Sequence, residues 1–106
     1  MTEEVTFDIG SATLTAKLRC EIDHHTARLM RTEIDKMIFI HKPEILVIDF
    51  SEVRFMDSSG IGLILGRLDK AESVGASLRL VGLSPTLMKL VRLAGIERMH
   101  NLSLTK

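Results

Sequence analysis

The sequence has no net charge, because 14 lysines and arginines balance 14 aspartates and glutamates over 106 residues. Proteins that bind nucleic acid usually carry a basic excess that neutralises phosphates, so direct binding to DNA or RNA is disfavoured. Uninterrupted apolar runs are short, as at residues 45–48, and none is long enough to span a membrane. The acidic start at residues 1–4 lacks the basic-then-apolar pattern of a signal peptide.

Cysteine is nearly absent as well. The single Cys20 excludes an internal disulfide and a multi-cysteine zinc site. Its acidic neighbours Glu21 and Asp23 raise a thiol pKa, which disfavours a reactive role. The chain has no linker, repeat or low-complexity stretch, and 45% of it is hydrophobic. We therefore expect one soluble, cytoplasmic domain covering residues 1–106, with no metal site.

Although the net charge is zero, acidic and basic residues are distributed unevenly along the sequence. Residues 1–57 carry seven basic and eleven acidic groups, whereas residues 76–106 carry five basic groups and one acidic group. Two interpretations are open: the charges are dispersed by chance over a folded surface, or the surface is bipolar and orients a charged protein partner.

Hydrophobic periodicity predicts the order of the elements. Residues 4–9 and 12–19 alternate apolar with polar side chains across Gly10-Ser11, which is typical of an antiparallel hairpin. Apolar spacings of three and four then predict three helices. Their starts are marked by Asp23, the 57–60 turn and Ser84, and their ends by Pro43, Gly75 and Gly95.

Between the helices, residues 45–50 are continuously apolar apart from Asp49 and predict a strand buried on both faces. Residues 78–81 predict another strand, and residues 99–104 predict either an edge strand or a frayed end. The order ββαβαβα, with right-handed crossovers, predicts an α/β fold. We expect a mixed, mostly parallel sheet of four to five strands covered by helices. Loops at the carboxyl ends of such strands favour partner sites, and residues 51–60 form such a loop.

The stretch Asp57-Ser58-Ser59-Gly60 lies at the junction of this loop and the second helix. Its simplest interpretation is a capping turn, but it also places two hydroxyls and a carboxylate at an exposed spot on a rigid element. A catalytic Ser58 would need a base, and no Gly-x-Ser-x-Gly elbow surrounds it. The only histidines are His24, His25, His41 and His100. The sequence therefore disfavours an enzyme.

The glycines at positions 60, 62 and 66 resemble a dinucleotide fingerprint only superficially, because the seven-residue loop 51–57 follows the preceding strand before the glycines begin. Gly62 and Gly66 lie about one helical turn apart, and glycine within a helix costs about 1 kcal/mol relative to alanine. A close approach of this helix face to the sheet, or to a partner, would explain them.

Two stretches, FMDSSGIGLILGR at residues 55–67 and EIDHHTA at residues 21–27, resemble the STAS domain family of anti-sigma factor antagonists. The second stretch points to the sporulation members that act on anti-sigma F factors. The resemblance covers nearly the whole chain, as far as Gly95-Ile96. Cys20 stands where this family usually has glycine.

The resemblance implies a non-enzymatic partner switch. Such a protein binds an anti-sigma factor that is also a serine kinase, and thereby releases a sigma factor. The kinase, to which ATP and magnesium belong, phosphorylates the first serine of the motif, and a serine phosphatase restores the protein. The resemblance implies no cofactor, phosphorylation at Ser58 with Ser59 mainly a capping residue, and a partner-binding surface made by Asp23, Asp57, Ser58, Ser59, Gly60 and Gly62.

Two alternatives differ in class. A nucleotide-binding sensor, suggested for STAS relatives, would bind GTP or ATP directly around residues 58–62. A small serine hydrolase would lose catalysis when Ser58 or a histidine is changed.

Overall fold

The computed structural model describes residues 4–105. Residues 1–3, on which the signal-peptide argument partly depended, lie outside the described residues. The elements are β1 (Val5–Ile9), β2 (Thr13–Leu18), α1 (His24–His41), β3 (Ile45–Asp49), α2 (Ser58–Ser73), β4 (Ser77–Val81), α3 (Pro85–Leu93), the short 3₁₀ helix η1 (Ile96–Arg98) and β5 (Leu102–Thr105).

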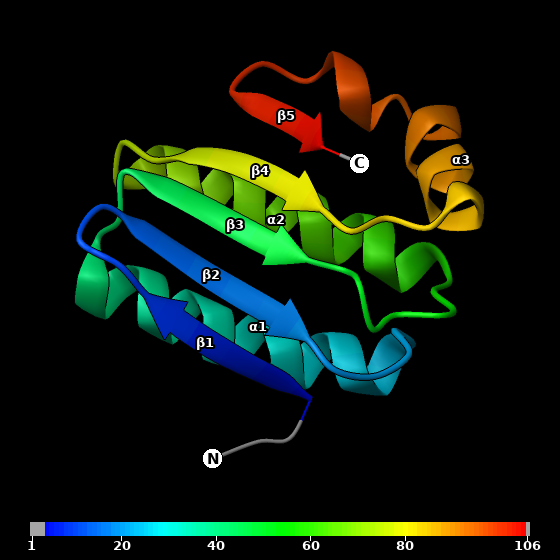
Figure 1. The fold of residues 1–106 in the computed structure, drawn as a ribbon, viewed down its shortest axis with the longest axis horizontal. Helices are drawn as coiled ribbons and strands as arrows, with labels where there is room; N and C mark the ends of the chain where they lie inside the picture. The colour runs from blue at the N-terminus through cyan, green and yellow to red at the C-terminus, as the bar shows by residue number, and fades with distance from the viewer. Residues whose placement is uncertain (1–3, 106) are drawn as a thin grey trace.

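Five strands form one mixed sheet in the order β1-β2-β3-β4-β5, as Figure 1 shows. β1 pairs antiparallel with β2, and every later pair is parallel. The predicted hairpin and α/β class are thus confirmed. Of the two alternatives for the tail, the edge strand is the one observed, because β5 pairs with β4.

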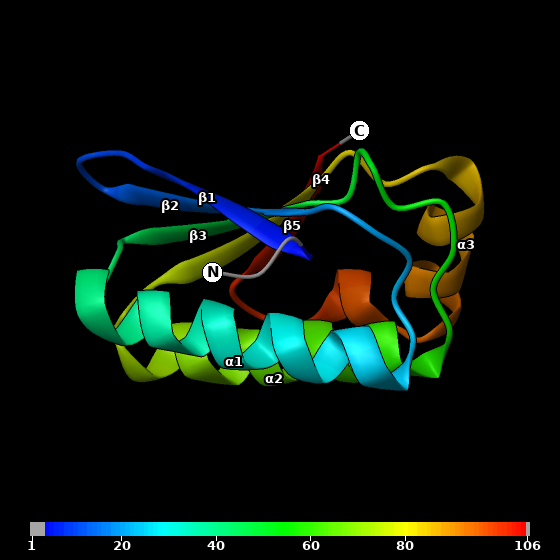
Figure 2. The ribbon, with the colours of Figure 1, turned by 90° about the horizontal axis from the view of Figure 1, so that it is seen from below.

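The helices cover one face of the sheet. Figure 2 shows α1 and α2 beneath that face, and Figure 1 shows them side by side, with α3 at the end toward which β2, β3 and β4 run. Alternate residues of the three central strands point toward α1 and α2 and form the core with them. These strand residues are Leu14, Ala16, Leu18, Leu46, Ile48, Leu78 and Leu80.

The prediction that residues 45–50 are buried on both faces is confirmed only in part, because the centre of β3 is buried and its two ends are not. Ile45 and Asp49 are only half-buried on the face that no helix covers, and Val47 between them is 9% exposed. The parallel strands follow one another in chain order across the sheet. Right-handed crossovers then all return over the same face, which leaves the opposite face open.

The predicted helix ends are confirmed by the backbone. Ser84 accepts a hydrogen bond from the backbone N–H of Leu87, and Pro85 occupies the first turn of α3. Gly75 and Gly95 follow α2 and α3 with φ of 78° and 77°, a left-handed conformation that costs glycine little. Among residues 4–105, no helix is both long and apolar enough to cross a membrane.

A buried ion pair joins α1 to α2. Arg67 Nε lies 2.8 Å from Asp35 Oδ1, and the Arg67 side chain is only 3% exposed. The contact is poorly directed for a hydrogen bond, so charge attraction dominates it. Burial raises the pKa of Asp35 and lowers the pKa of Arg67, and in each case the partner charge opposes the shift. Removing either partner would leave a buried charge unpaired, so the pair fixes how the two helices lie together.

Candidate partner-binding site

The structure places the starts of α1 and α2 side by side. β2 and β3 are parallel neighbours, so the loops after them leave the same edge of the sheet (Figure 1). An isolated bridge then joins the loops: Ile22 N–H donates to the Phe55 carbonyl at 2.9 Å, and Asp57 N–H donates to the Ile22 carbonyl at 3.1 Å. Asp23 and Asp57 each follow this bridge directly. The two helix caps are therefore held together by backbone hydrogen bonds.

Asp23 is the N-cap of α1 and forms a capping box with Thr26. Its Oδ1 accepts the Thr26 backbone N–H at 2.9 Å, and Thr26 Oγ1 accepts the Asp23 N–H at 2.9 Å. The first of these bonds is the main reason that the pKa of Asp23 lies below its ordinary value. The site therefore holds a fixed carboxylate at neutral pH.

Asp57 caps α2 in a similar way, since its Oδ1 accepts the Ser59 N–H at 2.7 Å. The expectation that Ser59 is mainly a capping residue needs correction, because Asp57 is the cap and Ser59 supplies only the bonded N–H. Ser58 is the first residue of α2 and is exposed. Within residues 4–105, its hydroxyl has no hydrogen-bond partner and is therefore accessible from solvent.

A shallow groove of about 220 Å³ lies between the first turns of α1 and α2. We call it the interhelix groove; its lining is His24, Ala27, Arg28, Arg31, Ser59, Gly62 and Leu63. In the part of the chain that the structure describes, neither arginine lies within ion-pair distance of a carboxylate. Sequence reasoning missed both arginines, although positions 24, 28 and 31 share one helix face.

The two predicted glycines have different surroundings. A Cβ built on Gly60 would lie 2.6 Å from Met56 Sδ and 3.0 Å from its Cγ, so the buried Met56 side chain occupies that space. A Cβ on Gly62 would meet nothing within 4 Å, and the same holds for Gly66. Close packing against the sheet therefore does not explain why glycine stands at position 62 or at position 66. Gly62 is exposed, so this face of α2 is open to solvent at that position.

Cys20 lies beside this edge of the sheet and is half-buried. Burial raises the pKa of its thiol, and Glu4, Asp23 and Glu21 raise it further, as predicted. Among the described residues, only Lys42 and Asn101 combine a side chain with positive φ. Cys20 is therefore outside the left-handed region, and its backbone does not require the glycine usual in the family.

The STAS domain family model matches residues 6–106 of the sequence. The chain belongs to the STAS domain family. Two similar relatives are anti-sigma F factor antagonists. The one from Paenibacillus polymyxa is 32% identical over 78% of this chain and 71% of its own. The one from Lysinibacillus sphaericus is 34% identical over 79% of this chain and 72% of its own.

Solved structures agree with this assignment. The unphosphorylated anti-sigma factor antagonist SpoIIAA has a TM-score of 0.74 and 28% identity, covering 96% of this STAS domain and 87% of that chain. The phosphorylated form of the Bacillus cell fate determinant SpoIIAA has a TM-score of 0.73 and 29% identity, covering 96% and 91%. A STAS domain protein from Planctomyces limnophilus has a TM-score of 0.82 at 14% identity, which speaks for the fold alone.

Two of the four histidines that a catalytic Ser58 could use as a base lie away from the site. His24 lines the interhelix groove, but His41 ends α1 and His100 precedes β5, both away from the helix starts. No hydrogen bond links Ser58 to a histidine within residues 4–105. Nor are three or more His, Cys, Asp or Glu side chains of this part of the STAS domain grouped closely enough to hold a metal ion. The two helix starts bring together the capping carboxylates of Asp23 and Asp57, the exposed Ser58 hydroxyl and the arginines of the interhelix groove.

Proposed function

We propose that this STAS domain is an anti-sigma factor antagonist that works as a phosphorylation-controlled partner switch in the cytoplasm. With Ser58 unmodified, it binds an anti-sigma factor that is also a serine kinase and so releases a sigma factor, the sporulation sigma factor F. The kinase brings its own ATP and magnesium and phosphorylates Ser58, which ends the binding. A serine phosphatase reverses the modification. The two relatives named as anti-sigma F factor antagonists support this proposal.

One observation carries the proposal. Ser58 presents an exposed, unbonded hydroxyl at the first position of α2, and the backbone bridge keeps this position next to the Asp23 carboxylate. A kinase needs an accessible hydroxyl on a surface that it already recognises. Ser58 has this accessibility, and Asp23 with the 57–62 turn gives the recognition surface.

The physics of a helix start explains how a phosphate would act there. A phosphate adds about −1.5 to −2 charges at pH 7. The free N–H groups and the dipole at the start of α2 favour negative charge and would stabilise it within the fold. A partner surface that complements the Asp23 and Asp57 carboxylates would instead meet a bulkier group with a much larger negative charge. Phosphorylation is therefore expected to change the contact surface and leave the fold intact.

Phosphorylation of Ser58 should accordingly change thermal stability only slightly. Charge at a helix start contributes about 0.3–1 kcal/mol, which corresponds to a few degrees in melting temperature for a domain of this size. Calorimetry and circular dichroism on the unmodified and fully phosphorylated protein measure this directly. A melting temperature lowered by tens of degrees, with loss of helical signal, would contradict a surface switch and indicate unfolding.

Substitutions at Gly60 and Gly62 should separate packing from docking. Gly60→Ala crowds the buried Met56 side chain, and we expect a loss of about 1–3 kcal/mol in the free energy of unfolding. Gly62→Leu points into open space, so the melting temperature should be unchanged or raised, while the bulk added to the interhelix groove should weaken binding. Thermal melts and titrations of both variants test this. A destabilised Gly62→Leu that binds normally would refute it.

The nucleotide-sensor alternative has one feature in its favour, since Arg28 and Arg31 line a groove beside the start of α2. That groove is about 220 Å³, below the roughly 300–1,000 Å³ of ordinary small-molecule sites. Calorimetric titration with GTP and ATP distinguishes this sensor from the switch. The hydrolase alternative gains no support from the geometry, because no base is in place at Ser58 in the described part of the chain.

The direct test of the proposed modification is incubation with the anti-sigma kinase, ATP and magnesium, followed by phosphopeptide mapping. One phosphoryl group on Ser58 is the expected result. A phosphoryl group on Ser59 or Ser51 would overturn the assignment, and no incorporation at all would overturn the switch.

A further inference from the structure

Helix α3 stands apart from the α1–α2 layer, beside the loop that leads into α2 (Figures 1 and 2). It buries Leu87, Met88 and Val91 against the rest of the molecule. Its opposite side carries Lys89 and Leu93, which lie four residues apart and therefore on one helix face. Leu93 is 77% exposed, the most exposed large apolar side chain among the described residues.

A groove of about 320 Å³ lies between α3 and residues 54–56. We call it the α3 groove. The apolar side chains of Phe55, Met56, Leu90 and Leu93 are in its lining, and Phe55 is itself 54% exposed. Exposed apolar groups gathered in a concave site are typical of a protein-docking surface.

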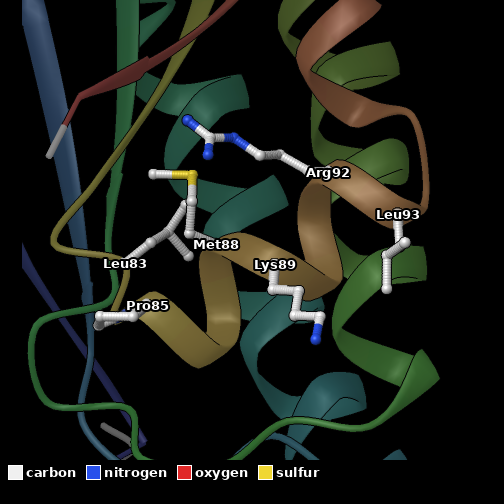
Figure 3. Close-up of a pocket in the computed structure, with 6 residues that line it drawn as sticks. All are labelled: Leu83, Pro85, Met88, Lys89, Arg92 and Leu93. Carbon is white, nitrogen blue, oxygen red and sulfur yellow. The ribbon is translucent and has the colours of Figure 1, made fainter.

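The charge of the α3 groove has one sign. Arg54 and Lys89 are in its lining, and no carboxylate is. Within residues 4–105, neither cation lies within ion-pair distance of an acidic group. A second hollow of about 610 Å³ on the other side of α3 shares Lys89 and Leu93 and adds Arg92, as Figure 3 shows. Arg92 Nε is already paired with Glu97 at 3.3 Å, whereas the α3 groove is lined by two unpaired cations, Arg54 and Lys89.

We infer that the α3 groove docks an acidic amphipathic segment of a protein partner. An apolar side chain of that segment would lie between Phe55 and Leu93, and its carboxylates would meet Arg54 and Lys89. The unpaired Arg54 and Lys89, set against the carboxylates of Asp23 and Asp57, favour the bipolar interpretation of the uneven charge, although Arg28 and Arg31 also place positive charge beside the two caps. Opposite charges at two ends of one surface fix the orientation of a partner and speed its association.

The identification of this partner as the anti-sigma factor rests on the proposed function. Residues 55–56 line the α3 groove and lead directly into Asp57 and Ser58, so one partner can cover both. An anionic membrane is the competing class of ligand for an apolar and basic surface. Membrane-binding helices project a long convex apolar face into the bilayer, whereas α3 has nine residues and buries its main apolar face. The concave shape favours a peptide segment.

The test uses two synthetic amphipathic peptides with the same leucine and phenylalanine positions, one with glutamates and the other with lysines between them. Each is titrated into the ¹⁵N-labelled protein. The acidic peptide should shift the amide resonances of Arg54, Phe55, Lys89 and Leu93, and the basic peptide should not. Equal shifts from both peptides, or shifts confined to other surfaces, would overturn the inference.

Matched variants sharpen this titration. Lys89→Glu should weaken binding of the acidic peptide by about tenfold or more, whereas Lys36→Glu, an exposed lysine on α1, should not. Leu93→Ser should also weaken binding of the acidic peptide. Phe39→Ser should not, because Phe39, although 73% exposed, lies near the C-terminal end of α1. If phosphatidylglycerol vesicles shift the same resonances and the acidic peptide does not, the ligand is a membrane and the inference is wrong.

The same variants are then titrated against the anti-sigma factor. If Lys89→Glu binds it normally while phosphorylation of Ser58 abolishes binding, the inference is wrong and the proposed function stands. If the wild-type protein does not bind the anti-sigma factor, the proposed function is wrong, and the peptide titration decides whether the α3 groove is a docking site.

Discussion

Ser58→Ala protein is expected to bind the anti-sigma factor as tightly as the wild type and to stay bound after ATP and magnesium are added. The substitution removes the hydroxyl at the first position of α2. It leaves the helix cap intact, because the cap is the hydrogen bond that Asp57 accepts from the backbone N–H of Ser59. Phosphoryl incorporation should fall to background. Radiolabel transfer and gel filtration of the mixture before and after addition of ATP measure both effects.

Ser59→Ala is the matched control for this result. Its hydroxyl is next in the chain and lines the interhelix groove, but its backbone N–H, which the cap requires, is retained. This variant should be phosphorylated and released like the wild type. Ser58→Asp should reproduce release only in part, since it adds one charge and a shorter side chain than phosphoserine. Release of the Ser58→Ala protein by ATP would contradict the account.

Asp23→Asn is expected to weaken binding by about 2–5 kcal/mol, the usual loss when a desolvated charge partner is removed. We expect the Asp23 carboxylate to meet an arginine of the kinase. Asparagine keeps a side-chain oxygen that accepts the Thr26 N–H, so α1 should retain its cap and the melting temperature should barely change.

Asp23→Ala serves as the comparison because it removes both the charge and the cap. It should weaken binding to a similar degree and also lower the free energy of unfolding by about 1 kcal/mol. Titration calorimetry and thermal melts on both variants separate the two effects. Wild-type affinity of Asp23→Asn would show that the carboxylate does not contact the partner.

Most of the fold could be predicted from the sequence because its determinants are local. Asp23 and Ser84 cap their helices where predicted, and Gly75 and Gly95 take the left-handed conformations expected after α2 and α3. The alternating pattern placed the hairpin correctly. Each of these features depends on residues within a few positions of one another.

The features that could not be predicted depend on contacts between distant segments. The bridge between Ile22 and Met56 joins two loops that are far apart in the sequence, and neither loop marks it by its own residues. The buried pair of Arg67 and Asp35 has no local signature. The open face of β3 follows from strand order rather than from its apolar composition. The α3 groove likewise could not be predicted from the sequence, because its lining comes from two distant segments, residues 54–56 and α3.

The most direct test of the switch compares two titrations of the same anti-sigma factor. One uses the unmodified protein and the other uses protein phosphorylated only at Ser58, with stability checked by a thermal melt in the same buffer. The account predicts tight binding of the unmodified protein and an affinity at least about a hundredfold lower for the phosphorylated protein, which corresponds to about 2.8 kcal/mol, with both proteins folded. Equal affinities for the two forms would contradict it.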